Sequence, residues 1–199
     1  CMDKDRAHKL ASLAGVEVPR SVCFSGLPSQ AELETLTRSL PFPVFVKPVR
    51  AGSSFGITKV ENPANLRAAV RDALRYDREV IVEETIAGFE VGCAVMGNAE
   101  LTTGRADEIE IQGDLFDYTE KYNLITSKIH MPARVDAETE RRIQDTAKSI
   151  YRALGCRGFA RVDMFLEPTG RLVFNEVNTI PGFTSHSRFP NMMLSLIHI

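Results

Sequence analysis

Two segments near the carboxyl end of the sequence, 158–165 and 173–178, consist mainly of apolar and β-branched residues, with the turn sequence Glu-Pro-Thr-Gly at 167–170 between them. Two such runs on either side of a turn predict a β-hairpin. A hairpin constrains the fold strongly, because alternate side chains on each strand point to opposite faces of the sheet. The pairing of these two strands therefore decides where each of their side chains lies.

Four polar side chains interrupt the hairpin segments, two on each strand and two residues apart. Each pair shares one face of its strand. If the turn consists of residues 167–170, Leu166 opposes Arg171 and both pairs lie on the same side of the hairpin. A slip of one residue in the register would place them on opposite sides. The four residues are Arg161, Asp163, Glu176 and Asn178.

These four side chains have the chemistry of a site for a metal ion and a phosphate group. Oxygen atoms from an aspartate, a glutamate and an asparagine amide suit a hard cation such as Mg²⁺ or Mn²⁺. The adjoining Arg161 supplies a fixed planar cation for a phosphate or an oxyanion. The alternative is a hairpin face that is simply solvated. The segment 181–187, Pro-Gly-Phe-Thr-Ser-His-Ser, follows directly and favours a site, because it is typical of a site-forming loop.

Composition places the chain among soluble globular proteins, since 44% of its 199 residues are hydrophobic and 25% are charged. A net charge of −2 argues against binding to nucleic acid. No apolar run reaches the length of a membrane span, and no signal peptide is recognisable. The widely spaced cysteines include no Cys-x-x-Cys pair, which fits a reducing compartment. We expect a cytoplasmic protein without nucleic-acid or membrane partners.

Helix and strand signals alternate along the sequence in two blocks. Helices are expected over 3–14, 29–40, from 62 and over 136–154, and strands over 42–48, 57–60, 79–84, 90–96 and 101–111. This alternation indicates an α+β fold with two sheets that face a shared cleft. We place one subdomain at 1–86 and a second at 87–199. A fragment of a longer protein is expected, because a helix begins at once at Asp3 and the last residues form an uncapped apolar run.

A loop rich in glycine and serine, 50–56, joins two predicted strands and follows Lys47 closely. It is not a Walker loop, because the sequence Gly-Lys-Ser/Thr before a helix is missing. Such a loop can still close over phosphates with backbone N–H groups and hydroxyls, while Lys47 supplies a positive charge. A flexible turn without function is the alternative.

Three carboxylates, Glu83, Glu84 and Glu90, lie on either side of Ile-Ala-Gly at 86–88. A carboxylate at the end of a strand can accept a hydrogen bond from an adenine amino group, and another can accept from ribose hydroxyls. The alternative is a set of surface carboxylates at a hinge between domains.

The polar and aromatic segment 112–127 lacks periodicity and is expected to be a functional loop. Its Lys121 and Tyr122 suit a lid that reaches a γ-phosphate. The alternative is a solvated loop tip. The isolated histidines, expected at the surface rather than in a site, are His8, His130 and His198.

Taken in order, these motifs resemble those of the ATP-grasp ligases, and within them the D-alanine–D-alanine ligase family. The resemblance covers nearly the whole chain, and its last block is highly specific. The matching motifs are Asp3-Lys4, Val46-Lys47-Pro48, Gly52-Ser53-Ser54, Glu83, Gly88-Phe89-Glu90, Lys121-Tyr122, Arg161-Val162-Asp163, Glu176-Val177-Asn178 and Pro181–Ser187. The resemblance implies the ATP-grasp fold, in which two α+β subdomains enclose a nucleotide cleft.

The resemblance also implies a role for each matching residue. It places the ATP phosphates on Lys4 and Lys47, and it assigns Ser53 and Ser54 to the loop that covers these phosphates. It places adenine on Glu83 with the backbone of Glu84 and Ile86, and ribose on Glu90. It places Lys121 near the γ-phosphate and Tyr122 in a hydrogen bond with Ser53. It implies two Mg²⁺ (or Mn²⁺) held by Asp163, Glu176 and Asn178, an oxyanion hole of Arg161 and the Gly182 N–H, and a second-substrate carboxylate on Ser187.

The reaction that the resemblance implies is the joining of D-alanine to a second D-amino acid. ATP would convert the D-alanine carboxylate to an acyl phosphate, which the second amine then attacks. Ala51 and Arg188 stand where ordinary cell-wall ligases carry glutamate and leucine, and they look more like the vancomycin-resistance ligases. The Glu-Lys-Tyr sequence ending at Tyr122 favours D-serine over D-lactate, with D-alanine as the other candidate acceptor. Arg188 is expected to help to form the acceptor pocket. The family also implies a homodimer, and a fragment without the first domain is expected to be inactive.

Overall fold

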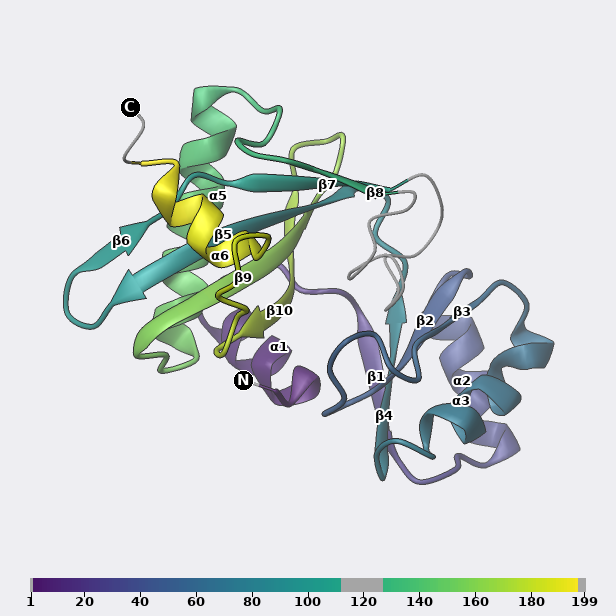
Figure 1. The fold of residues 1–199 in the computed structure, drawn as a ribbon. Helices are drawn as coiled ribbons and strands as arrows, with labels where there is room; N and C mark the ends of the chain where they lie inside the picture. Colours follow the sequence, from purple (N-terminus) through teal and green to yellow (C-terminus); the bar gives the residue numbers. More distant parts are fainter. Residues whose placement is uncertain (1, 112–126, 197–199) are drawn as a thin grey trace.

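The computed structural model describes residues 2–111 and 127–196. Within them the chain forms two antiparallel sheets with helices packed on both (Figure 1). The predicted lid residues Lys121 and Tyr122 lie outside the described residues. None of the described helices combines the length and the apolar character needed to cross a bilayer.

The smaller sheet has four strands in the order β1-β4-β2-β3. Its elements are β1 (Ser21–Ser25), α2 (Gln30–Ser39), β2 (Val44–Pro48), β3 (Thr58–Val60), a 3-10 turn (Pro63–Asn65), α3 (Leu66–Ala73) and β4 (Glu79–Glu84). Helices α2 and α3 cover one face, where apolar side chains such as Leu36, Val46 and Val70 form a core. The opposite face is left for polar side chains such as Lys47 and Glu83.

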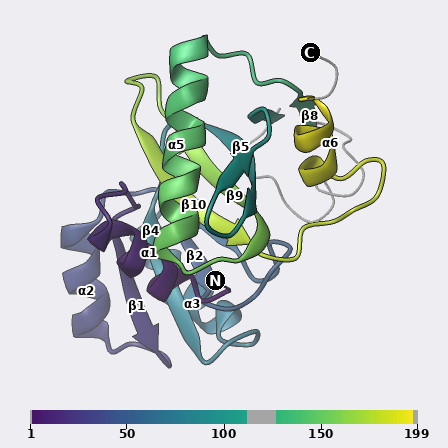
Figure 2. The ribbon, with the colours of Figure 1, turned by 90° about the vertical axis from the view of Figure 1, so that its left-hand side faces the viewer.

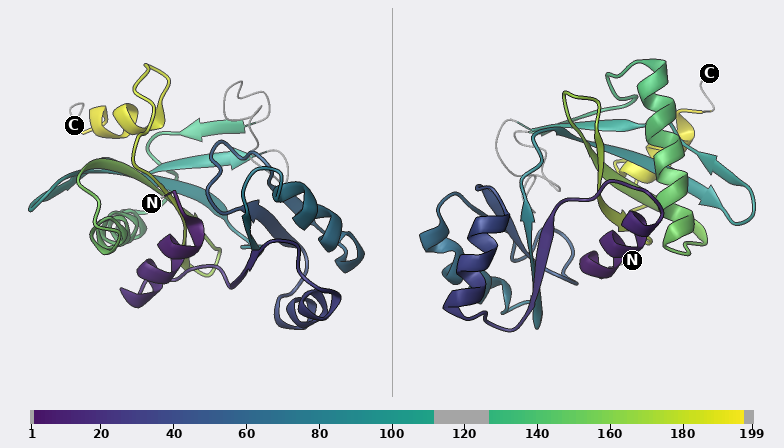
Figure 3. Two further views of the ribbon diagram at one scale, coloured as in Figure 1. Left: turned by 90° about the horizontal axis from the view of Figure 1, so that it is seen from below. Right: turned by 180° about the vertical axis from the view of Figure 1, so that it is seen from behind.

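The larger sheet has six strands, with β10-β9-β5-β7-β8 in order and β6 paired to β5. Its strands are β5 (Phe89–Gly97), β6 (Leu101–Thr103), β7 (Asp107–Ile111), β8 (Ser127–His130), β9 (Gly158–Leu166) and β10 (Leu172–Asn178). Its helices are α1 (Lys4–Leu13), α5 (Ala137–Ala153) and α6 (Arg188–Leu194). Figures 2 and 3 show α5 and α1 on one face of this sheet and α6 on the other.

Alternation along β5 explains this layering. Cys93 and Val95 belong to the core beneath α1 and α5. Ala94 points to the other face and packs with Phe189 and Met192 of α6. The polar residues of β9 that the sequence singled out, Arg161 and Asp163, pair with Ala94 and Gly92 and so lie on the α6 face.

The predicted hairpin is present, but its predicted register is wrong. Leu166 pairs with Leu172 rather than with Arg171, a shift of one residue. A β-bulge between Phe174 and Glu176 then shifts the register by one more residue. The two shifts together return the polar pairs to one face, with Asp163 opposite Glu176 and Arg161 opposite Asn178.

Local capping signals were reliable guides to the helices. The side chain of Asp3 accepts from the Arg6 N–H at the start of α1, and Ser29 and Glu32 form a capping box before α2. Asp136 accepts from the Thr139 N–H and so starts α5 as predicted.

Three features of the elements differ from what the sequence suggested. The helical spacing of Ala7, Leu10, Ala11 and Ala14 predicts a buried Leu10, but this residue is 47% exposed. The strand expected over 101–111 is two strands, β6 and β7. Helix α6 was not predicted, because no capping side chain marks its start.

The hydrophobic cores do not follow the chain order at the amino end. Ala7, Ala11 and Val16 pack in the core of the larger sheet, although the strands that follow them belong to the smaller one. Helix α1 therefore lies beside β10, at the junction of the two sheets.

Candidate active site

A cavity of about 350 Å³ lies between the two sheets. Its walls come from β2 and β4 on one side and from β5, β9 and β10 on the other. The predicted site residues that line it are Lys4, Lys47, Ser54, Glu83, Glu84, Ile86, Glu90 and Glu176. Residues separated by more than a hundred positions in sequence thus share one cavity, which can receive a ligand with both polar and apolar parts.

Lys47 and Glu83 form a buried ion pair at the wall made by the smaller sheet. The Lys47 ammonium lies 2.5 Å from a Glu83 carboxylate oxygen, and the two residues are only 8% and 1% exposed. Burial disfavours the charge on Glu83, but the neighbouring Lys47 and His8 outweigh it and lower the pKa of the carboxyl. The Glu83 carboxylate is therefore charged near neutral pH and accepts a hydrogen bond from Lys47 at the cavity wall.

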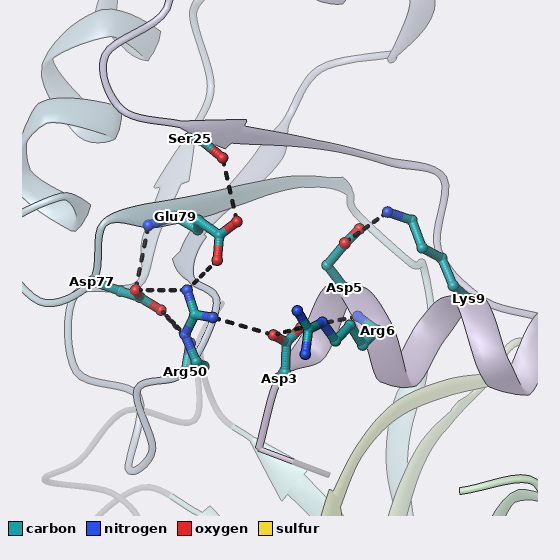
Figure 4. Close-up of polar contacts among 8 residues, drawn as sticks. All are labelled: Asp3, Asp5, Arg6, Lys9, Ser25, Arg50, Asp77 and Glu79. Carbon is teal, nitrogen blue, oxygen red and sulfur yellow. Dashed lines mark hydrogen bonds and ion pairs between the residues drawn. The ribbon is translucent and has the colours of Figure 1, made fainter.

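The glycine- and serine-rich loop is anchored at its base by charge pairs (Figure 4). Arg50 donates to both carboxylate oxygens of Asp77 at 3.1 Å, to Asp3 at 3.3 Å, and also to Glu79. Asp3 is also the cap of α1, so the same network fixes the start of the helix that carries Lys4. The Lys4 ammonium donates to the Ala51 carbonyl at 2.7 Å, which holds it at the mouth of the loop.

Two serines at the tip of the loop have an uncommon backbone conformation. Ser53 and Ser54 have φ values of 52° and 59°, in the left-handed region that side-chain-bearing residues seldom adopt. Ser54 lines the cavity, whereas Ser53 does not appear among its lining residues within the described part of the chain. Strained backbone of this kind is often found where a loop contacts a ligand.

Two predicted carboxylates on the cavity wall are already paired within the protein. Glu84 accepts from the Arg20 guanidinium at 2.7 Å, and Glu90 accepts from Arg188 at 2.8 Å. Arg20 in the Glu84 pair is largely exposed, so the contribution of this pair to stability is small.

Arg161 and Asp163 form a two-oxygen ion pair on β9. The guanidinium donates to both carboxylate oxygens, with contacts of 2.8, 3.1 and 2.8 Å. Burial disfavours the charge on Arg161, but Asp163 outweighs it and raises the pKa of the guanidinium. This geometry holds the planar cation rigidly at the face of the hairpin.

Arg188 lies at the first position of α6 and is held by carboxylates of the larger sheet. Asp107 accepts from it through both oxygens at 2.6 and 2.7 Å, and Asp163 lies 3.4 Å away. Burial opposes the charge, yet Asp107 and Asp163 raise the pKa of Arg188 well above its ordinary value. A Cβ atom on Gly92 would collide with this pair, so the strand beneath it needs glycine.

The predicted metal ligands lie next to one another across the hairpin. Asp163 is opposite Glu176, and Asn178 follows two residues later on the same face. Two carboxylates and an amide oxygen have the chemistry of a hard-cation site. Over 2–111 and 127–196 no group of three His, Cys, Asp or Glu side chains has a metal-binding arrangement. The predicted set differs from such a group because one of its members is an amide.

The segment 181–187 forms a tight loop before α6. Ser187 Oγ accepts from the Thr184 N–H at 3.0 Å, and a Cβ atom on Gly182 would lie only 2.6 Å from it. Phe183 packs against Phe159 and Phe189, with ring centroids 5.2 and 5.3 Å away. The loop is thus fixed close to the end of β9 that carries Arg161.

A sequence profile of known proteins, described as "D-ala D-ala ligase C-terminus", matches residues 14–195. The chain belongs to this family. Its fold is the ATP-grasp fold that the sequence predicted, because solved D-alanine–D-alanine ligases share it. The D-alanine–D-alanine ligase from Coxiella burnetii superposes with a TM-score of 0.81 at 29% identity over 96% of this chain and 51% of that one.

Two other relatives come from Enterococcus faecalis. The structure of the VanG D-Ala:D-Ser ligase is 64% identical, with a TM-score of 0.91 over 98% of this chain and 57% of that one. The vancomycin B-type resistance protein VanB is 46% identical over 96% of this chain and 56% of its own length. The chain spans little more than half the length of the ligases it matches.

Sequence reasoning missed two buried polar residues that contact predicted site residues. His8, expected at the surface, is only 3% exposed. The spacing of Lys4, Ala7, His8 and Ala11 on one helical stripe would have placed it inside. Asp107 is fully buried against Arg188, and nothing in its local sequence indicated a partner eighty-one residues away.

Proposed function

We propose that the protein joins D-alanine to a second D-amino acid, with D-serine preferred, in an ATP-dependent reaction. Membership in the D-alanine–D-alanine ligase family supports the reaction class. The observation that carries the proposal is the single cavity in which Lys4, Lys47 and Glu83 face Glu176 of the hairpin. Positive groups, an acidic wall and the hairpin carboxylates are the elements that phosphoryl transfer requires.

The nucleotide takes the side of the cavity formed by the smaller sheet. Lys4 and Lys47 bind its phosphates, and the tip of the loop with Ser53 and Ser54 closes over them. Glu83, with the backbone of Glu84 and Ile86, receives adenine, and Glu90 receives the ribose. The chain at 84–88 lines the cavity, which supports an adenine position there. Lys121 and Tyr122 lie outside the described residues, and the resemblance alone assigns them to the γ-phosphate and to Ser53.

The hairpin carries the chemistry of the two reaction steps. Asp163, Glu176 and Asn178 fit two Mg²⁺ or Mn²⁺ ions, which would neutralise the phosphoryl group as it moves to the D-alanine carboxylate. The amine of the acceptor attacks the resulting acyl phosphate, so that the peptide bond forms as inorganic phosphate leaves and the amine gives up a proton. Arg161 and the Gly182 N–H stabilise the oxyanion of that step.

The acceptor lies beside the loop 181–187. Ser187 receives its carboxylate, because this hydroxyl is fixed at the same end of the hairpin as Arg161. Arg188 shapes the pocket by holding α6 against the sheet, since its guanidinium is occupied by Asp107 and Glu90. The 64% identity to a D-Ala:D-Ser ligase supports D-serine as the acceptor. D-alanine is the second candidate, supported by the match to D-alanine–D-alanine ligases.

The biological role that follows is the supply of peptidoglycan precursors that confer vancomycin resistance. We propose a cytoplasmic homodimer with subdomains at 1–86 and 87–199, acting on small molecules and not on nucleic acid or membranes. The resistance proteins among the relatives support this role.

Calorimetry tests the proposal on the complete natural protein that contains this chain. ATP analogues should bind with Mg²⁺ present, and Glu176→Gln should weaken the dependence on the metal by removing one ligand charge. Lys47→Ala should weaken nucleotide binding at every metal concentration. Glu167→Gln, in the turn of the same hairpin, serves as the control and should leave both the nucleotide affinity and its metal dependence unchanged. Metal-independent binding in the wild type, or unaltered metal dependence in Glu176→Gln, would count against the assignment.

A further inference from the structure

His8 is a buried residue beside the cavity, where it contacts one lining residue from each wall and has no role in the proposed reaction. Its ring Nε2 lies 2.8 Å from the carbonyl oxygen of Asn175, in the bulge of β10. Its Nδ1 lies 3.7 Å from a carboxylate oxygen of Glu83 on β4. The edge of the ring contacts Phe174, with the centroids 5.4 Å apart at 76°. One buried ring thus touches both sheets.

The contact with Asn175 fixes the position of one hydrogen atom. A carbonyl oxygen can only accept, so Nε2 must carry the hydrogen and donate it. Asn175 is the extra residue of the bulge and has no partner on β9 in the strand register. The bulge is also what returns Glu176 to the face of Asp163. The histidine therefore stabilises the peptide group directly before a predicted metal ligand.

The same ring packs against Glu83 on the nucleotide wall, at a distance too long for a hydrogen bond. One Glu83 oxygen accepts from Lys47, while the other faces His8 Nδ1. These two facing atoms, Glu83 Oε1 and His8 Nδ1, are buried and make no hydrogen bond to any part of the chain that the structure describes. Buried polar atoms of this kind are uncommon and call for a specific role.

We propose that His8 is a positioning residue that couples the two walls of the cavity. Its Nε2–H holds the bulge at Asn175, and with it Glu176, at a fixed distance from the Glu83–Lys47 pair. The proposal rests on the proposed function, because it concerns how the nucleotide wall and the metal-binding wall are kept in register. It assigns to α1 a second task beside carrying Lys4.

Three substitutions separate the contacts of the ring. Glutamine places an amide N–H near the position of Nε2, asparagine places one near Nδ1, and phenylalanine keeps the ring but neither polar atom. His8→Phe and His8→Asn should raise the metal concentration needed for half-maximal nucleotide binding by roughly tenfold, the scale of one lost hydrogen bond. His8→Gln should bring this metal concentration back to within about twofold of the wild-type value. Lys9→Gln, at the neighbouring exposed position of α1, is the control.

The measurement uses calorimetric titration of the complete protein with an ATP analogue at several Mg²⁺ concentrations, beside thermal unfolding. A purely structural role would lower the unfolding temperature in proportion to lost contacts without a selective change in metal dependence. Wild-type metal dependence in His8→Phe overturns the proposal, and so does failure of His8→Gln to recover what His8→Phe loses.

Isotope-edited NMR keeps the test independent of nucleotide binding. Nε2 of His8 should carry the proton, and the backbone amide of Glu176, which shares a peptide plane with the Asn175 carbonyl, should shift in His8→Phe and return in His8→Gln. Protonation at Nδ1 alone, or an unchanged Glu176 amide in His8→Phe, refutes the role of His8. Absence of nucleotide binding in the wild type with these shifts intact would instead refute the proposed function.

Discussion

At the scale of single residues, the buried Glu83 makes stability depend on pH. Glutamine at this position leaves Lys47 buried without its anion, so Glu83→Gln should lower the free energy of unfolding by about 3–5 kcal/mol at neutral pH. The folded-state pKa of Glu83 lies below its ordinary value of 4.5. Its stabilising contribution is therefore complete above about pH 4.5 and is lost as the pH falls through the lowered pKa.

Urea unfolding at a series of pH values checks this prediction, because the gap between wild type and variant should close in acid. Glu84→Gln on the same strand is the matched control. Glu84 pairs with the largely exposed Arg20, so this change should cost at most about 1 kcal/mol. A Glu83→Gln gap that persists unchanged in acid would show that the carboxylate is not the source of the effect.

Arg161 is the second residue whose geometry gives a sharp prediction. Asp163 holds its guanidinium through both oxygens, so the cation is fixed before any substrate arrives. Arg161→Ala should lower turnover by roughly 10²–10³, with a smaller effect on nucleotide affinity. Arg161→Lys keeps the charge but not the planar fork, so its turnover should lie between those of the wild type and Arg161→Ala. Steady-state kinetics measure this, and a folded Arg161→Ala enzyme with near-normal turnover would remove Arg161 from the mechanism.

At the scale of elements, α6 is held on the larger sheet by apolar packing and by the buried cation of Arg188. Arg188→Leu would leave Asp107 buried without a partner, so the free energy of unfolding should fall by about 3–5 kcal/mol. Asp107→Asn in the same chain should recover part of this loss, because it removes the stranded charge. Denaturant unfolding of the two single variants and the double variant measures the coupling. Strictly additive losses would mean that the two side chains do not stabilise each other.

The hairpin shows what sequence patterns can and cannot predict about an element. Alternation predicted both strands and the pairs Arg161–Asp163 and Glu176–Asn178. The register was not predictable locally, because the bulge at Asn175 is held by a contact from His8, 167 positions earlier. The short α6 was hidden for a related reason. Its stability comes from packing of Phe189 and Met192 on Ala94, not from a capping signal.

At the scale of the whole molecule, the cavity joins segments that no local pattern connects. The sequence predicted two sheets around a cleft, and some of the predicted site residues line it, among them Lys47, Glu83 and Glu176. It did not predict that α1 packs on the larger sheet, since its apolar stripe would fit either core. That placement brings Lys4 and His8 to the junction between the sheets, so the first helix links the two walls.

The proposed choice of acceptor also concerns the whole molecule, because the residues assigned to it lie in α6, in the hairpin and in the segment 112–126 of the sequence. An amine acceptor needs a neutral nucleophile, which a neighbouring lysine favours over the ammonium form. A hydroxyl acceptor such as D-lactate must lose a proton, a task suited to histidine near neutral pH. The sequence has Lys121 and Tyr122 in this segment and no histidine between Gly104 and Ile129.

The complete protein should therefore make dipeptides, with D-serine as the favoured acceptor and little depsipeptide. A single reaction that contains ATP, D-alanine, D-serine and D-lactate, with its products separated by mass spectrometry, measures the preference directly. The same reaction without D-serine is the control and should shift the product to the D-alanine dipeptide, because the amine-binding groups are unchanged. Predominant D-alanyl-D-lactate would overturn the argument from the loop residues. Predominant D-alanyl-D-alanine would leave the chemistry intact and reject only the preference for D-serine.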